Sequence, residues 1–189
     1  MSIDAIRTLV ADPPWAFRDA LPGGGRGAYK HYRLLALHEI MRFPLPDLAE
    51  DCRLFLWVPA SLISLGLQVV EAWGFHFTTE GIWLKVRADG RQGTLAGSVV
   101  YPQSRIGMGR TFRMVHEPFL VGYRGHPQRL DASMPSVLMA PFQTEHSQKP
   151  AEFYEMVERL SPGPYAELFA RKERPGWECF GDALERSHP

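Results

Sequence analysis

The chain has 189 residues, of which 45% are hydrophobic, and its 21 acidic side chains balance 21 basic ones. This size and apolar content suit one compact domain over residues 1–189, and zero formal net charge argues against a protein that coats nucleic acid over its whole surface. No apolar run approaches the ~20 residues of a membrane helix, and the N-terminus lacks a basic segment before an apolar one, so we expect a cytoplasmic protein with no membrane partner.

The predicted elements alternate between strands and helices along the chain. In chain order we expect a strand at 7–11, short helices within 37–51, a strand at 53–58, a helix at 61–73, strands at 76–86, 117–123 and 136–140, a helix at 150–160 and a strand at 165–170. Such alternation predicts an α/β domain with a mostly parallel sheet flanked by helices, and ligands at the carboxyl ends of its strands. The Gly-rich stretch 21–27 interrupts this pattern, and we interpret it as an active-site loop.

Cysteine and histidine usage gives no sign of a metal centre or a disulfide framework. The chain has two cysteines, Cys52 and Cys179, and we interpret both as buried structural residues. Its seven histidines show no paired-ligand spacing, so we predict no metal.

The most informative stretch is Asp12-Pro13-Pro14-Trp15, directly after the first predicted strand. Proline fixes its own φ and pushes the preceding residue toward extended geometry, so we expect the Asp12 carboxylate and the Pro13 carbonyl to be free acceptors. Two acceptors can bind an amine that carries two hydrogens, and the indole of Trp15 offers a face on which a planar ring could stack. An amino-bearing nucleobase fits this description. A plain exit from a strand, with Trp15 as core filling, is the structural alternative.

Further segments, combined with this tetrapeptide, carry a resemblance to a known family. They are Leu54-Phe55-Leu56-Trp57-Val58, Trp73-Gly74-Phe75, Gly81-Ile82-Trp83-Leu84-Lys85, His116-Glu117 with Phe119-Leu120-Val121-Gly122, His146-Ser147-Gln148-Lys149-Pro150, and Glu167-Leu168-Phe169-Ala170-Arg171. In this order they resemble the MT-A70 family of S-adenosylmethionine-dependent adenine N6-methyltransferases, which act on RNA or DNA. The resemblance covers nearly the whole chain and implies a Rossmann-like class I methyltransferase fold.

The resemblance implies how the catalytic and cofactor residues divide their work. Asp12, Pro13, Pro14 and Trp15 would form the catalytic part, with methyl transfer directly to the adenine amine. The cofactor S-adenosylmethionine would be bound by His146, Ser147, Lys149, Glu167, Phe169, Arg171 and Asp182. Within this group, Lys149 would pair with the methionine carboxylate, and Glu167 and Arg171 would flank the ribose. The family commonly has Asn at the position of Asp182, and an ionised Asp cannot donate a hydrogen bond. Residues 4–6 are one possible source of contacts to the cofactor adenine.

Nucleic-acid contacts are expected from loops around the strand ends. Between Lys85 and Arg129 eight basic residues face two acidic ones, and several of the arginines alternate with glycines. Arg pairs bidentately with phosphate, so we expect Arg110 and Arg113 to contact substrate, with Tyr32 as a second aromatic for the base. An ordinary solvated loop is the alternative.

Three functional alternatives remain at this stage. The resemblance to small prokaryotic or phage members favours DNA as the substrate, with RNA as the first alternative. The second is a catalytically inactive nucleic-acid-binding subunit, and a homodimer or a partner subunit is possible in either case. The third is a nucleotide-binding α/β protein without methyl transfer, against which the missing Walker-type glycine loop counts.

Overall fold

The computed structural model describes residues 5–16, 34–86, 93–95, 99–101, 111–112, 114–141 and 148–181. The elements over these residues are β1 (Ile6–Ala11), α1 (Leu37–Met41), β2 (Leu48–Trp57), the 3₁₀ turn η2 (Ala60–Leu62), α2 (Ile63–Ala72), β3 (His76–Val86), β4 (Gly93–Leu95), β5 (Val99–Tyr101), β6 (His116–Arg124), β7 (Val137–Pro141), α3 (Ala151–Leu160), β8 (Tyr165–Leu168) and β9 (Trp177–Phe180).

Seven of these strands form one sheet in the order β7-β3-β6-β2-β1-β8-β9. Neighbouring strands pair in parallel except around β6, which runs antiparallel to both β2 and β3. The α/β class is confirmed, but the sheet is mixed. The chain leaves β3 and enters β6 at the same edge of the sheet, where Leu84 pairs with His116, so these two neighbours run in opposite directions.

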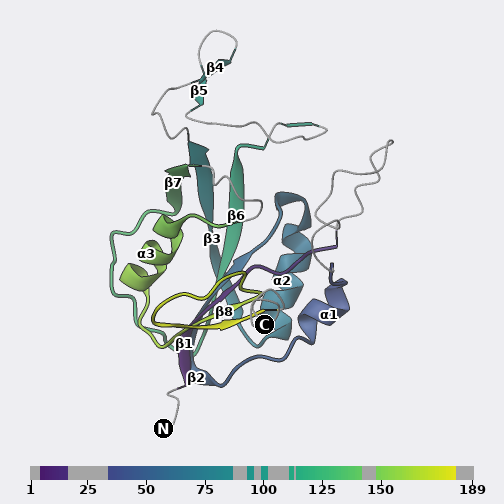
Figure 1. The fold of residues 1–189 in the computed structure, drawn as a ribbon, viewed down its shortest axis with the longest axis vertical. Coiled ribbons are helices and arrows are strands. Elements are labelled where there is room, and N and C mark those ends of the chain that lie inside the picture. Colours follow the sequence, from purple (N-terminus) through teal and green to yellow (C-terminus); the bar gives the residue numbers. More distant parts are fainter. Residues whose placement is uncertain are drawn as a thin grey trace, which may run out of the picture.

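Helices cover both faces of the sheet, with α1 and α2 on one side and α3 on the other (Figure 1). The central strands are apolar on both faces, as buried parallel strands are. Along β2, Leu54 and Leu56 point toward α1 and α2, whereas Phe55 and Trp57 point toward α3. This alternation divides the core into two clusters.

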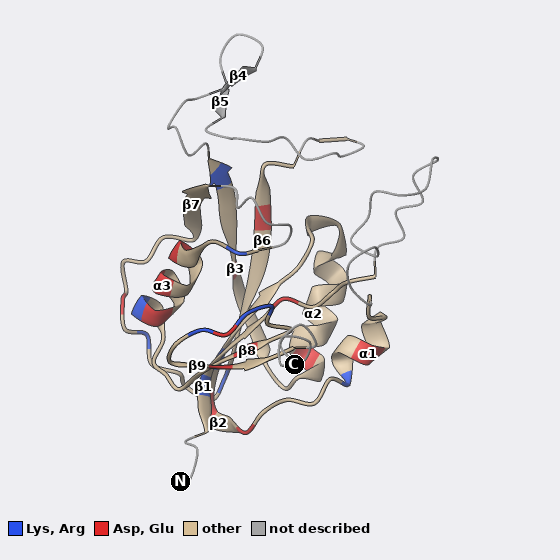
Figure 2. Cartoon of the chain, viewed as in Figure 1, with Lys and Arg blue, Asp and Glu red and all other residues tan. Residues whose placement is uncertain are grey.

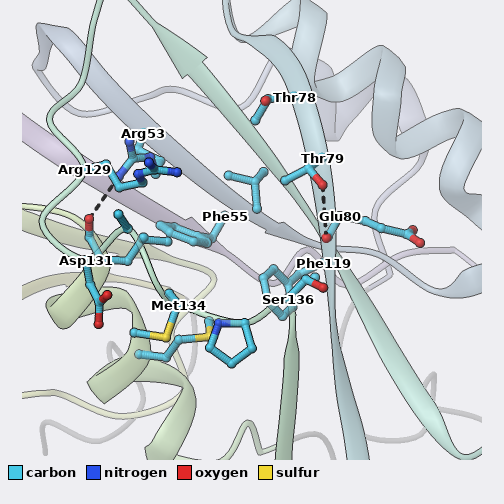
Figure 3. Close-up of a pocket in the computed structure, with 16 residues that line it drawn as sticks. Arg53, Phe55, Thr78, Thr79, Glu80, Phe119, Arg129, Asp131, Met134 and Ser136 are labelled. Atoms are coloured by element: carbon cyan, nitrogen blue, oxygen red, sulfur yellow. Dashed lines mark hydrogen bonds between the residues drawn. The ribbon is translucent and has the colours of Figure 1, made fainter.

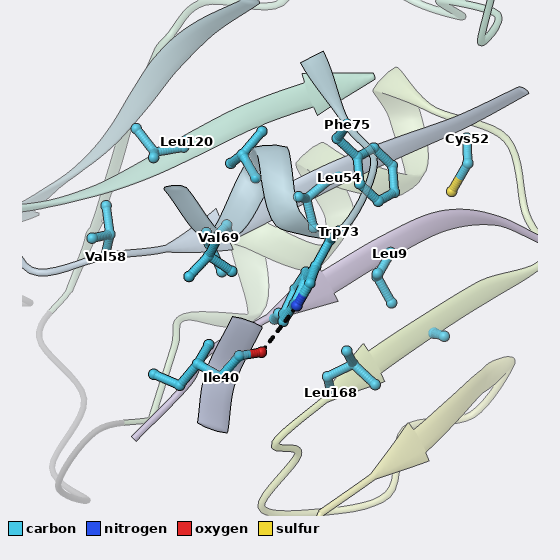
Figure 4. Close-up of a cluster of buried hydrophobic side chains, with 14 of the residues drawn as sticks. Leu9, Ile40, Cys52, Leu54, Val58, Val69, Trp73, Phe75, Leu120 and Leu168 are labelled. Carbon is cyan, nitrogen blue, oxygen red and sulfur yellow. Dashed lines mark hydrogen bonds between the residues drawn. The ribbon is translucent and has the colours of Figure 1, made fainter. Parts of the chain in front are cut away.

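The cluster beneath α1 and α2 is mostly aliphatic (Figure 4). Its polar atoms are paired, since the buried indole of Trp73 donates to the Ile40 carbonyl at 3.0 Å. Gly74 follows α2 with a φ of 78°, a left-handed conformation that suits glycine at a helix end, as the sequence predicts. Cys52 is buried in this cluster as expected, whereas Cys179 on β9 is only half-buried.

The cluster beneath α3 is aromatic and centres on Phe153, which is fully buried. The Phe153 ring centroid lies 4.7 Å from Trp57, 5.2 Å from Phe119 and 6.2 Å from Phe55. Tilted and edge-on pairs of this kind add to the free energy gained by burial alone. Helix α3 is therefore fixed over the middle of the sheet.

Three stretches differ from the sequence-based expectation. Residues 48–51, expected to be helical, begin β2, because Leu48 pairs with Ile6 and the Ile6 amide donates to Asp47 at 2.8 Å. Strand β8 ends at Leu168, since Phe169 has a φ of 62°. Strand β9 was not expected from the sequence, and in the structure it is defined by its parallel pairing with β8.

Truncating Phe153 tests whether the aromatic cluster holds the two layers together. We expect Phe153→Ala to lower the free energy of unfolding by about 3–5 kcal/mol, because a fully buried ring leaves a cavity. The matched control is Phe112→Ala at a side chain that is 75% exposed, with an expected change within about 0.5 kcal/mol. Urea unfolding at fixed pH measures both, and equal shifts would contradict the packing described.

Candidate active site

Asp12 lies just past the carboxyl end of β1, between β2 and β8. Val10 pairs with Glu167 across the β1–β8 ladder, and the Asp12 amide donates to the Leu168 carbonyl at 3.4 Å. The chain continues from β1 to β2 on one side of β1, and the strand on the other side, β8, comes much later in the sequence. The order of the strands in the sheet therefore changes direction at β1. Ligands of open α/β sheets bind at such a point. The expected meeting of Asp12 with the segment that starts at Glu167 is confirmed.

The residues after Asp12 are held by hydrogen bonds on both sides. The Trp15 amide donates to the Pro13 carbonyl at 2.9 Å, and the Leu35 amide donates to the Pro14 carbonyl at 2.9 Å. The Trp15 indole donates to the Trp57 carbonyl at 3.0 Å, which ties the ends of β1 and β2 together. The segment is therefore rigid where it leaves the sheet.

Two details of this segment correct the sequence-based expectation. The Pro13 carbonyl is not free, because it already accepts the Trp15 amide, although a carbonyl oxygen has a second lone pair. The Trp15 side chain is 6% exposed and belongs to the aliphatic core cluster, so its faces contact protein. Trp15 therefore fixes the segment to the hydrophobic core.

The ammonium of Lys149 lies against the Asp12 carboxylate. Lys149 Nζ is 3.3 Å from Asp12 Oδ1 and 3.0 Å from Glu117 Oε2, and it sits 4.6 Å from the ring centroid of Trp57. The Lys149 and Asp12 side chains are 10% and 17% exposed. The cation is thus held by two carboxylates and an aromatic face, a set of contacts that compensates for its burial.

A second lysine extends this group of charges. Lys85, at the end of β3, donates to Glu117 Oε1 at 2.6 Å, and Glu117 lies at the start of β6. Figure 2 shows a basic and an acidic position at these two strand ends. Asp12, Lys149, Glu117 and Lys85 therefore form one chain of ion pairs, which we call the charge chain.

The surroundings of the charge chain shift the pKa values of its members. Burial raises the pKa of Asp12, and the positive charges of Lys149 and Arg171 oppose that shift. Burial lowers the pKa of Lys149, but the charges of Asp12 and Glu117 outweigh it and raise the pKa overall. Burial also raises the pKa of Glu117, yet the two lysines together hold it at about 2. The ionised forms of Glu117 and Lys149 are therefore strongly favoured.

Trp57 forms the aromatic floor of the site. It is 1% exposed at the end of β2, and its ring lies beneath the Lys149 ammonium. Among the described residues, its indole N–H is one of two buried side-chain nitrogens without a hydrogen-bond partner, the other being Arg174 Nε. Buried donors without partners are rare, so these two atoms mark places where a ligand could accept a hydrogen bond.

The β8 side of the site contains a second buried carboxylate. Glu167 is 7% exposed and accepts a hydrogen bond from the Tyr154 hydroxyl at 2.7 Å, and burial raises its pKa. Beyond it, the chain turns sharply at Phe169, whose ring packs on Phe43 with centroids 4.3 Å apart. Gly181 approaches this turn so closely that a Cβ there would overlap the Ala170 carbonyl, which explains the glycine.

The structure brings together some of the predicted site residues and leaves others undecided. Asp12, Lys149, Glu167, Phe169 and Arg171 come together at the strand ends. Six predicted residues lie outside the described part of the chain, and they are Tyr32, Arg110, Arg113, His146, Ser147 and Asp182.

Three residues of the site, Glu117, Lys85 and Trp57, were not assigned a role from the sequence. They stand inside motifs that carry the family resemblance, but a spacing pattern cannot tell that the end of β3 and the start of β6 lie at the same edge of the sheet as the end of β1. Only the strand order of the folded sheet brings these motifs to Asp12.

A separate hollow of about 280 Å³ lies on the α3 face toward the opposite end of the strands (Figure 3). Arg53, Phe55 and Phe119 contribute to its lining, and the Arg53 guanidinium is engaged by the carbonyls of Pro127, Gln128 and Leu160. No member of the charge chain lines it. We therefore place the candidate site at Asp12.

No three His, Cys, Asp or Glu side chains in the described part of the chain converge as metal ligands. No helix there has both the length and the apolar character needed to cross a membrane.

Comparison with known proteins gives a match over nearly the whole chain. The MT-A70 family model matches residues 6–183. The N(6)-adenosine-methyltransferase catalytic subunit METTL3 of Homo sapiens is 32% identical over 186 residues, which are 95% of this chain and 28% of that protein. An N(6)-adenosine-methyltransferase MT-A70-like protein of Drosophila melanogaster is 30% identical, covering 94% of this chain and 26% of that protein. The type II methyltransferase M.MunI of Mycoplasma sp is 24% identical, covering 93% of this chain and 76% of that protein.

The depressed pKa of Glu117 predicts a pH-dependent contribution to stability. A carboxylate whose pKa falls from 4.5 to about 2 on folding stabilises the fold above about pH 4.5, and this contribution is lost as the pH falls toward 2. We therefore expect Glu117→Gln to be less stable than the parent at pH 6, with the difference shrinking between pH 4.5 and pH 2. Urea midpoints across this range test it, with Glu155→Gln on the exposed face of α3 as the charge control. A difference that stays constant with pH would contradict it.

Proposed function

The chain belongs to the MT-A70 family, and we propose that it transfers a methyl group to the exocyclic N6 amine of adenine in a nucleic acid. The observation that carries this proposal is the Asp12 carboxylate, 17% exposed at the sheet's switch point, beside an aromatic floor and a lysine. A carboxylate is the acceptor that an amine with two hydrogens needs.

Asp12 would act on the amine by accepting one of its hydrogens. The lone pair of the adenine amine is delocalised into the ring, which makes it a weak nucleophile. A hydrogen bond to Asp12 favours the tetrahedral geometry in which that pair is available, and the rigid Pro13-Pro14 exit holds the carboxylate in place. The product amine must also lose a proton, and Asp12, whose pKa burial raises, is positioned to receive it.

The described residues fit S-adenosylmethionine, which supplies an electrophilic methyl group when bound. Its carboxylate requires a cation, and the Lys149 ammonium is buried at the strand ends. Its ribose requires an acceptor, and Glu167 has one oxygen beyond that used by Tyr154. The unpartnered N–H groups of Trp57 and Arg174 are further donors. His146, Ser147, Phe169, Arg171 and Asp182 would complete this part of the site.

A substrate adenine in a duplex would have to be unstacked from its neighbouring bases to reach the site. Asp12 is 17% exposed, so a base within a duplex could not reach it without being flipped out. We favour DNA over RNA because the chain resembles small prokaryotic or phage members of the family, and a type II methyltransferase of Mycoplasma sp is among its relatives. Arg110, Arg113 and Tyr32 remain the proposed contacts to the nucleic acid. A homodimer or a partner subunit remains part of the proposal.

The first experiment replaces the proposed amine-binding carboxylate. We expect Asp12→Asn to lower methyl transfer at least about a hundredfold, since the amide oxygen is a weaker acceptor and cannot take a proton. Binding of S-adenosylhomocysteine, measured by calorimetry, should persist and show that the variant is folded. Asp131→Asn is the matched control, because Asp131 pairs with Arg159 away from the site. Unchanged turnover in the Asp12 variant would overturn the assignment.

The second experiment decides the nucleic acid. The protein is incubated with S-adenosylmethionine labelled in its methyl group and separate pools of duplex DNA, single-stranded DNA and RNA. We expect label in DNA and its recovery as N6-methyladenine after digestion. Label in RNA alone would replace DNA by RNA, and label in none of the pools would favour the inactive, nucleic-acid-binding alternative.

A further inference from the structure

Lys149 covers one oxygen of the Asp12 carboxylate and the ring of Trp57 beside it. Its ammonium lies on the Asp12 carboxylate at 3.3 Å and over the Trp57 ring at 4.6 Å. The Oδ1 atom of the proposed acceptor and the face of the Trp57 ring beside it are thus both covered by one side chain. An adenine amine cannot bind Oδ1 while the ammonium stays there.

The contacts of Lys149 also show how its ammonium could move away from Asp12. Its ammonium is also bound to Glu117 at 3.0 Å, and Glu117 is the more exposed carboxylate, with 36% of its side chain accessible. Lysine has a flexible stem of four carbons, so its ammonium can move between anions at a small conformational cost. A new carboxylate arriving beside Lys149 would compete with Asp12 for the same cation.

We propose that Lys149 blocks the adenine site until a ligand carboxylate draws its ammonium away from Asp12. The carboxylate is that of the amino-acid portion of the methyl donor, so this inference rests on the proposed function. Its consequence is an order of binding, in which the donor enters first and adenine second. An empty enzyme would then not hold adenine unproductively.

A pair of related nucleosides separates the carboxylate from the rest of the donor. S-adenosylhomocysteine has the carboxylate, whereas 5′-methylthioadenosine has the same adenosine and a thioether without it. Fluorescence anisotropy measures the Kd of a labelled single-stranded DNA oligonucleotide with one adenine. The same oligonucleotide with purine in place of adenine lacks only the amine, so the ratio of the two Kd values is the amine-dependent preference.

With saturating S-adenosylhomocysteine we expect a preference for adenine of about tenfold, the size of one hydrogen bond to a charged acceptor. With 5′-methylthioadenosine, or with no ligand, we expect no preference. In Lys149→Met, which keeps an apolar stem without the charge, the preference should appear without any ligand. Lys172→Met, an exposed lysine in the turn between β8 and β9, is the control and should behave like the parent.

The outcomes distinguish this inference from the function on which it rests. An equal preference for adenine in the parent with either nucleoside or with none would overturn the blocking role and leave the proposed function standing. No preference for adenine with any ligand or variant would count against Asp12 as the amine acceptor, and with it against the proposed function. The comparison of the two nucleosides uses the parent protein, so it holds even if Lys149→Met fails to fold.

Discussion

The parallel pairing of β1 with β2 and β8 is the constraint on which the candidate site depends. Strand β1 is short, and four of its six residues, Leu9 to Ala11 and Ile6, are buried apolar side chains that pack on both faces. Parallel strands end at the same edge of a sheet, so this pairing places Asp12, Trp57 and the end of β8 beside one another. The helix layers on the two faces of the sheet then pack on β1 from both sides.

The antiparallel strand β6 adds what a fully parallel sheet would not provide. Because β6 runs the other way, its first residues, rather than its last, meet the carboxyl ends of β2 and β3. This brings Glu117 to the same edge as Lys85 and Lys149. Two cations and two carboxylates can then be partly buried together, whereas any one of them alone would carry a larger desolvation cost. The reversal of one strand is therefore what makes the charge chain possible.

Much of the fold could be predicted from local sequence, and less of the site. Apolar periodicity located β1, α2, β3, β6 and α3, and Gly74 marked the end of α2. Residues 48–51 were wrongly expected to be helical, because their place in β2 depends on pairing with Ile6, a contact between distant segments. Within the site, the motifs indicated Asp12 and Lys149 as functional, but only the fold shows them in direct contact.

The largest difference between sequence and structure concerns what each functional side chain contacts. A motif can indicate that Asp12 accepts hydrogen bonds and that Lys149 binds an anion, but it does not reveal that each is the other's partner. That pairing joins residues far apart in the chain, and Lys149 lies just before α3, which packs on the sheet through Phe153. Closing the long intervening loop costs conformational entropy, which the packing of α3 on the sheet must offset. The site is therefore assembled by the sheet together with α3, because a segment with β1 and β2 alone contains Asp12 but not its lysine partner.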